Sequence, residues 1–298
     1  MNRLTPFYHH SGDPLFDVET RRALWSDART LTRRTLVWAI VMCAAGFALF
    51  VIMWQVMLLR QPSVSSYYTM ASFYIIFSMT LVSLWLDMAC LRTSIRAINS
   101  EILSGRWDLL RLTPIRIQAI LNAKHAAAQV RAWRTLAQVI GLRAALLPIM
   151  ILWVIFSLDY FITPTGTPAL FRAQYIISLA YALVFTVMLM LEPVWRMRAM
   201  TALGVAVSAQ TRDQTGAWLL GLAGVFVVWL GQLAVLVGVV IGWGLFSFMF
   251  ALGSVWLSVL CLAPAGLAIL SLAAYGYYLV VRTWALRRAA RRLANLES

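Results

Sequence analysis

The feature that most constrains this chain is a series of six apolar blocks. Each is long enough to cross a lipid bilayer as a helix, which takes roughly 20 residues. Because backbone N–H and C=O groups cannot stay unpaired in lipid, a spanning segment must be a helix or a strand of a closed barrel. The blocks lack the alternation of apolar and polar residues typical of barrel strands, so we predict an all-α integral membrane protein with six transmembrane helices. The blocks cover residues 36–59, 69–91, 138–158, 173–194, 217–242 and 259–283.

Composition favours the same fold class. The chain is 62% hydrophobic and 12% charged, whereas soluble domains carry about 25% charged residues. We expect a single transmembrane domain over residues 36–283, between a cytoplasmic N-terminus (1–35) and a basic cytoplasmic C-terminus (284–298). The N-terminus lacks the apolar core of a secretory signal peptide, so the first block is expected to remain in the membrane.

The distribution of positive charge predicts the topology. The net charge is +14, and the basic residues are 24 arginines and one lysine. They flank alternate ends of the blocks, whereas the opposite ends carry only Arg60 and Arg172. This asymmetry predicts a multi-pass protein of the cell (inner) membrane, the plasma membrane, with both termini in the cytoplasm. We expect contacts with anionic lipid head groups, and no nucleic-acid partner, because no nucleic-acid-binding motif accompanies the charge.

Three segments outside the six blocks carry patterns of their own. Asp13 and Pro14, followed by Leu24, Trp25 and neighbouring arginines, predict an amphipathic elbow helix in the membrane interface, with a plain linker as the alternative. Residues 243–256 predict a short re-entrant helix on the outer side, unless the fifth or sixth span is longer. Residues 195–217 predict a short helix on or just inside the cytoplasmic surface.

A polar segment at residues 98–125 separates the second and third blocks. The second helix is expected to continue to about Ser104, where Gly105 lets the backbone turn. A short helix from Arg106 to Leu112 follows, with Trp107 as an aromatic anchor on an apolar and charged ridge. Such a ridge is a reasonable docking surface for a partner protein, and a solvated connector is the alternative. The residues expected to bind the partner are Glu101, Gly105, Arg106, Trp107, Asp108, Arg111, Thr113 and Pro114.

This segment resembles the cytoplasmic signature of ABC-2-type transporter permeases, which runs roughly E-x-x-x-G-T-x-E-x-L-x-x-T-P and then I and G-K. The N-terminal run from Asp13 and Pro14 to Glu19 and Arg21 is similar to that family's entry into an elbow helix. The six-span order agrees as well. The chain departs from the pattern at three places: Arg106 replaces the usual Thr, Asp108 stands for the second acid, and Ala123 replaces the Gly before Lys124.

The resemblance implies that the chain is the permease subunit of an ABC transporter. We expect this transporter to be an exporter. Residues 98–125 would hold a coupling helix that sits in a groove of a cytoplasmic ABC ATPase subunit, and a second permease copy would complete the pair. The chain itself has no phosphate-binding loop and no catalytic or metal-ligating constellation, so we expect it not to be an enzyme and to hold no cofactor. ATP and Mg would belong to the partner. The alternative is a permease-like scaffold subunit of a larger membrane complex without transport activity.

Three charged residues lie near or within the apolar blocks: Asp87, Arg143 and Glu192. A charge at the bilayer centre costs about 2.5–3.5 kcal/mol on insertion scales, so each should have a partner. We predict that Asp87 pairs with Arg143 or Arg92, and that Glu192 pairs with Arg196 one turn along the helix. A structural role and a substrate or proton role both remain open. The absence of a charged lining elsewhere mildly favours lipidic or amphipathic cargo.

Overall fold

The computed structural model is all-helical over the residues that it describes. These are residues 16, 28–60, 64–112, 115–149, 151, 168–211, 213–251 and 263–295, and they contain no strand. The predicted all-α class is therefore confirmed for this part of the chain. The predicted elbow helix within residues 1–35 lies almost entirely outside the described residues.

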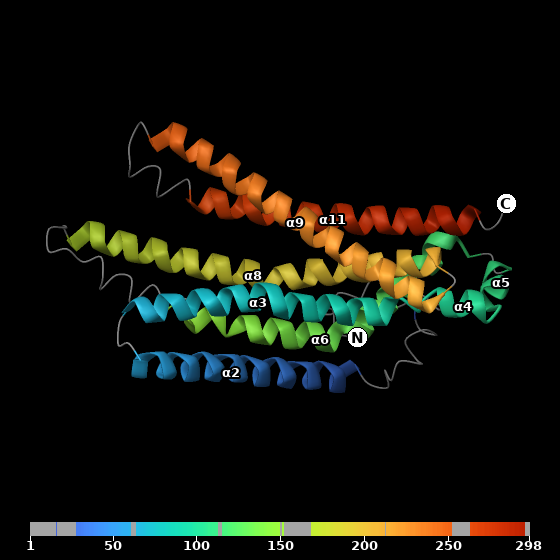
Figure 1. Cartoon of the computed structure of the whole chain (residues 1–298), viewed down its shortest axis with the longest axis horizontal. Coiled ribbons are helices and arrows are strands. Elements are labelled where there is room, and N and C mark those ends of the chain that lie inside the picture. The colour runs from blue at the N-terminus through green and yellow to red at the C-terminus, as the bar shows by residue number, and fades with distance from the viewer. Residues whose placement is uncertain are drawn as a thin grey trace.

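In the described part of the chain there are six long helices, and two short ones join the second to the third (Figure 1). The short helices are α4 (Asn99–Leu103) and α5 (Arg106–Arg111). They lie at one end of the bundle, beside the C-terminal end of α11 and the first turns of α6 (Figure 1). The long helices are α2 (Ala28–Arg60), α3 (Val64–Ser94), α6 (Ile117–Ala144), α8 (Pro168–Gln210), α9 (Gln214–Ala251) and α11 (Ala263–Asn295).

Among the described residues, four segments are long and apolar enough to cross a membrane. Their composition makes this a membrane protein with transmembrane helices, as predicted. The third predicted span ends in residues 152–158, which lie outside the described residues, and the fourth lies within α8. The four segments are Arg33–Val56, Ser72–Leu103, Gln214–Gly242 and Ala268–Asn295.

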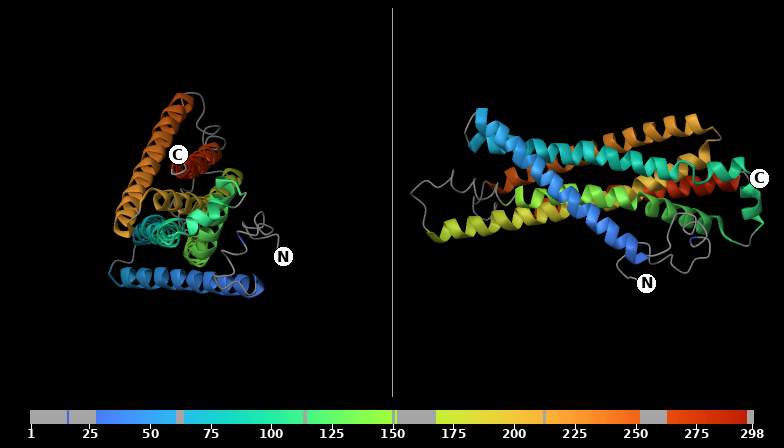
Figure 2. Two further views of the ribbon diagram at one scale, coloured as in Figure 1. Left: turned by 90° about the vertical axis from the view of Figure 1, so that its right-hand side faces the viewer. Right: turned by 90° about the horizontal axis from the view of Figure 1, so that it is seen from below.

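The helices form a central group with two peripheral members. α11 packs along α8, and α3 and α6 pack against α8 and against each other. α2 lies along α6 on one side, and α9 lies on another side of the group (Figure 2). Both peripheral helices expose large apolar side chains, such as Ile40 and Ile52 on α2 and Phe226 and Val240 on α9. Side chains of this kind suit contact with lipid tails rather than with water.

Two expectations about the helix ends need correction. Residues 195–210 are not a separate surface helix, because they form the second half of α8 and are buried from Met197 to Ala209 apart from half-buried Arg198. Small side chains there, including Ala199, Ala202 and Ala206, let neighbouring helices approach closely and cover them. Within the segment 243–256, α9 continues without interruption to Ala251, which matches the alternative of a longer fifth helix. Residues 252–256 lie outside the described residues.

Candidate functional site: a buried charge network and the α4–α5 segment

Asp87 of α3 is fully buried and is paired with Arg196 of α8. The guanidinium donates from Nε to Oδ1 at 2.8 Å and from a terminal nitrogen to Oδ2 at 2.7 Å, so the contact is bidentate. Trp229 of α9 donates its indole N–H to the same Oδ2 at 2.9 Å. Its ring also lies 4.4 Å from the Arg196 guanidinium carbon, in a cation–π arrangement. Paired contacts of this kind satisfy both carboxylate oxygens within a dry interior.

Arg143 of α6 is buried and paired with Glu192 of α8, with 2.7 Å between the guanidinium and Oε2. The same guanidinium nitrogen donates to the carbonyl oxygen of Leu189 at 2.7 Å. That carbonyl lies four residues before Pro193, which stands inside α8 and has no N–H to complete the helical hydrogen bond. Arg143 therefore supplies the donor that the proline removes.

The two ion pairs join into one network. Glu192 Oε1 accepts from Arg196 at 3.2 Å, as the predicted one-turn pair, and from the Tyr278 hydroxyl of α11 at 2.5 Å. Arg196 also donates to Gln232 of α9 at 3.0 Å. The other terminal nitrogen of Arg143 donates to the Ser83 hydroxyl of α3 at 2.6 Å. Five helices thus meet at two carboxylates and two guanidinium groups, which balance in charge.

The prediction that Asp87 pairs with Arg143 or Arg92 is wrong. α8 packs against both α3 and α6 and presents Arg196 to Asp87 and Glu192 to Arg143, so each of these charges finds its partner on α8. Arg92 lies on the exposed side of α3, away from Asp87. The positions of Asp87 and Arg143 in their apolar blocks predicted similar depths in the membrane. They could not predict which helix would face each of them.

The closed geometry defines what the network can do chemically. All four carboxylate oxygens accept at least one hydrogen bond, and both carboxylates are buried. Removing one partner from a buried pair costs about 3–5 kcal/mol, because it strands the other charge. The arrangement therefore favours the structural role over a substrate or proton role. Among the described residues no cluster of His, Cys, Asp or Glu is placed to hold a metal ion.

The α4–α5 segment lies at the end of the bundle. α3 ends at Ser94, and a turn over residues 95–98 leads into α4, so the predicted continuation to Ser104 is interrupted once. Gly105 has φ of 70°, in the left-handed region, and makes the predicted turn between α4 and α5. α6 then begins at Ile117 with Arg116 as its extended cap residue. Thr113 and Pro114 lie outside the described residues.

Side chains from α6 and α8 fasten this segment to the bundle. The Ser208 hydroxyl of α8 accepts from the backbone N–H groups of Ile98 and Asn99 at 3.0 and 2.9 Å. These groups lie at the start of α4, where helical N–H groups have no partner within the helix. Lys124 of α6 is buried and forms an ion pair with Glu101 of α4 at 2.5 Å. The segment is therefore attached to the bundle through both its backbone and a side chain.

The sequence suggested that Trp107 is an exposed anchor, but in the structure it is part of a buried cluster. Its side chain is 4% exposed and packs with apolar residues of α6, α8 and α11. A six-residue helix over a bundle end has to bury its largest apolar side chain, and the leucines beside it then point outward. Leu103, Leu109 and Leu112 are 67%, 66% and 83% exposed. Arg106 is exposed, and the side chains of Asp108 and Arg111 lie outside the described set.

Several residues of the network were not recognised from the sequence as its members. Tyr278, Gln232, Trp229 and Ser83 sit in apolar blocks where single polar or aromatic residues are common. One signal was available for α8, because Glu192, Pro193 and Arg196 place two charges and a missing N–H within one turn. A glutamate and an arginine one turn apart in an apolar block, beside a carbonyl that a proline leaves without its helical donor, indicate that neighbouring helices supply polar partners.

Comparison with known proteins returns no match: no family model, curated protein or solved structure matches this chain.

Proposed function

We propose that this chain is the membrane subunit of an ABC transporter of the ABC-2 type, an exporter that couples to a separate cytoplasmic ATPase subunit. The observation that carries the proposal is the α4–α5 segment, whose outer surface bears exposed Leu103, Leu109 and Leu112 while its inner surface is fixed to the bundle. Apolar side chains that point away from a bundle end suit a protein partner rather than water. The resemblance of residues 101–124 to the permease signature supports the same partner.

In this proposal the segment receives force and the partner supplies it. ATP and Mg would bind the ATPase subunit, whose closure would push on α4 and α5. Trp107, Glu101 and the start of α4 attach to α6 and α8, so a displacement would pass to those helices rather than be absorbed in a loose loop. Two copies of the chain would enclose the translocation path. Six spans would place both termini and the segment on the cytoplasmic side of the inner membrane.

The experiment purifies the chain from native membranes and measures the ABC ATPase subunit that is recovered with it. Leu109→Asp with Leu112→Asp introduces charge on the outer surface without touching the buried cluster, and we expect recovery of the ATPase with the chain to fall at least tenfold. The matched control is Thr215→Asp with Ala294→Asp, two exposed positions on α9 and α11 that add the same charge without changing α4 or α5. The control should retain the ATPase, and both variants should melt at the wild-type temperature.

Equal recovery of the ATPase by the leucine variant and the wild type would contradict the docking role. A second measurement tests the division of labour. The purified chain alone should hydrolyse no ATP, whereas the complex should, and the leucine variant should lose the hydrolysis that depends on the permease.

The closed charge network favours a second candidate, a scaffold subunit. Helices joined by charge-balanced ion pairs and hydrogen bonds between α3, α6, α8, α9 and α11 suit a fixed arrangement as well as a moving one. Purification from native membranes distinguishes the two. An ATPase with a nucleotide-binding motif in the complex supports the transporter, and stable association with redox or light-harvesting subunits supports the scaffold.

A further inference from the structure

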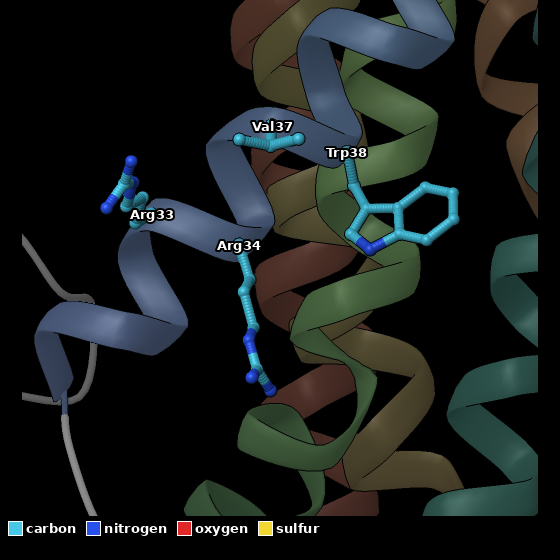
Figure 3. Close-up of a pocket in the computed structure, with 4 residues that line it drawn as sticks. All are labelled: Arg33, Arg34, Val37 and Trp38. Carbon is cyan, nitrogen blue, oxygen red and sulfur yellow. The ribbon is translucent and has the colours of Figure 1, made fainter.

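A basic and aromatic cavity opens at the N-terminal end of α2. Four residues from two successive helical turns line it, Arg33, Arg34, Val37 and Trp38, and its volume is about 330 Å³ (Figure 3). That volume is at the low end of small-ligand sites, which range over roughly 300–1,000 Å³. The cavity is therefore large enough for a head group but not for a whole lipid.

Helical spacing arranges these side chains as two parallel columns. Arg33 and Val37 stand one turn apart, as do Arg34 and Trp38, so each column has a guanidinium toward the N-terminal end and an apolar body behind it. Arg134 of α6 lies over the Trp38 ring, with its guanidinium carbon 4.8 Å from the ring centroid, in a cation–π arrangement.

No acidic side chain offsets the positive charge of the cavity, either on α2, which lines it, or on the adjoining α6. Neither α2 nor α6 contains an acidic residue along its whole length. Over the described part of the chain, Arg33 and Arg34 form no ion pair or hydrogen bond. Two exposed guanidinium groups, with Arg134 on the adjoining helix, therefore create a positive potential that attracts an anion such as a phosphate.

An apolar strip continues from the cavity along the outer face of α2. Leu36, Val37, Ile40 and Val41 are about half exposed or more, at 57%, 50%, 59% and 49%. They belong to a segment, Arg33–Val56, that is apolar enough to cross a membrane. A phosphate held at the arginines would thus sit at the membrane surface, with an apolar surface leading away from it into the lipid.

We propose that this cavity is a binding site for an anionic phospholipid, with the head-group phosphate on Arg33 and Arg34, the upper glycerol region against Trp38, and an acyl chain along Val37, Ile40 and Val41. The strip identifies the lipid as the occupant, since a free phosphate would use the arginines and leave the strip without a role. The proposal goes beyond transport and requires only that α2 lies in a membrane.

The test measures lipid binding to the detergent-purified chain by native mass spectrometry, with phosphatidylglycerol and phosphatidylcholine as probes. We expect Arg33→Gln with Arg34→Gln to weaken phosphatidylglycerol binding roughly 30-fold, which corresponds to about 2 kcal/mol at 1.4 kcal/mol per decade. Phosphatidylcholine binding should change little. Trp38→Leu should also weaken phosphatidylglycerol binding, although it leaves the net charge unchanged.

The matched control is Arg291→Gln with Arg292→Gln, which removes two exposed arginines from the far end of α11. An equal loss of lipid in the control would mean that binding follows net charge alone, and would overturn the site. Inorganic phosphate at millimolar concentration provides the second arm. Failure to displace the lipid supports the proposal, whereas full displacement would identify a soluble anion as the occupant and overturn the lipid assignment. Circular dichroism of each variant checks that the helices remain folded.

Discussion

The buried charge network and the α4–α5 segment place energetically costly groups in opposite environments: the network buries charged side chains, and the segment exposes apolar ones. The network places four charges inside the bundle and satisfies the two carboxylates with donors from α6, α8, α9 and α11. The segment buries one large aromatic side chain, Trp107, and leaves three leucines outside. The first arrangement balances its charges within the described residues, and the second exposes apolar side chains that no described residue covers. The contrast indicates that the network fixes how the helices pack, while the segment leaves a surface on which the proposed partner would bind.

The largest effect is expected from breaking the network on one side. Asp87→Ala removes the bidentate partner of Arg196, which is 1% exposed, and leaves the buried network with one unbalanced positive charge, so it should lower the free energy of unfolding by about 3–5 kcal/mol. Thermal unfolding in detergent measures the loss. Asp87→Ala with Arg196→Met removes both charges and should cost much less than the sum of the two single changes. Additive losses would show that the pair is not coupled.

Trp107→Ala should have the next largest effect. It empties a buried site between α5 and the helices α6, α8 and α11, and Trp-to-Ala changes in cores cost about 3–5 kcal/mol. Because the segment lies at the end of the bundle and can partly collapse, we expect the lower end of that range. Trp107→Phe is the control and should recover most of the loss in the same unfolding measurement. If Trp107→Ala melted like the wild type, the burial of this side chain would be contradicted.

A smaller effect is expected from Ser208→Ala. The change removes the acceptor for two backbone N–H groups at Ile98 and Asn99, and leaving buried donors unsatisfied costs about 1–3 kcal/mol. Hydrogen exchange should report it locally, with faster exchange in residues 98–103 and unchanged exchange in α9. Ser208→Thr retains the hydroxyl and serves as the control. Unchanged exchange in the alanine variant would rule out the tie between α8 and α4.

The smallest effect on stability is expected at the exposed leucines. Leu112→Ser removes an apolar side chain that is 83% exposed, and surface changes of this kind stay within about 0.5 kcal/mol. The unfolding temperature should therefore equal that of the wild type. A loss comparable to that of Trp107→Ala would erase the distinction between the inner and outer surfaces of the segment.

The sequence predicted the helical class, the turn at Gly105, a short helix at 106–112, which the structure has at 106–111, and the pair between Glu192 and Arg196. These features depend on residues close together in the chain, where helical geometry fixes which side chains are neighbours. The partner of Asp87 and the burial of Trp107 could not be predicted in the same way. Both depend on which helix lies opposite, and that depends on small residues along α8, such as Ala202 and Ala206, which carry little signal of their own.

The contact between Arg143 and the carbonyl of Leu189 has a consequence for how this sequence can change over evolutionary time. Pro193 is tolerable in the middle of α8 because another helix supplies the missing donor. Loss of the arginine alone would leave that carbonyl bare, whereas loss of the proline would let the backbone reclaim it. Positions 143 and 193 are therefore expected to vary together among relatives of this chain, with substitution of the proline preceding any loss of the arginine.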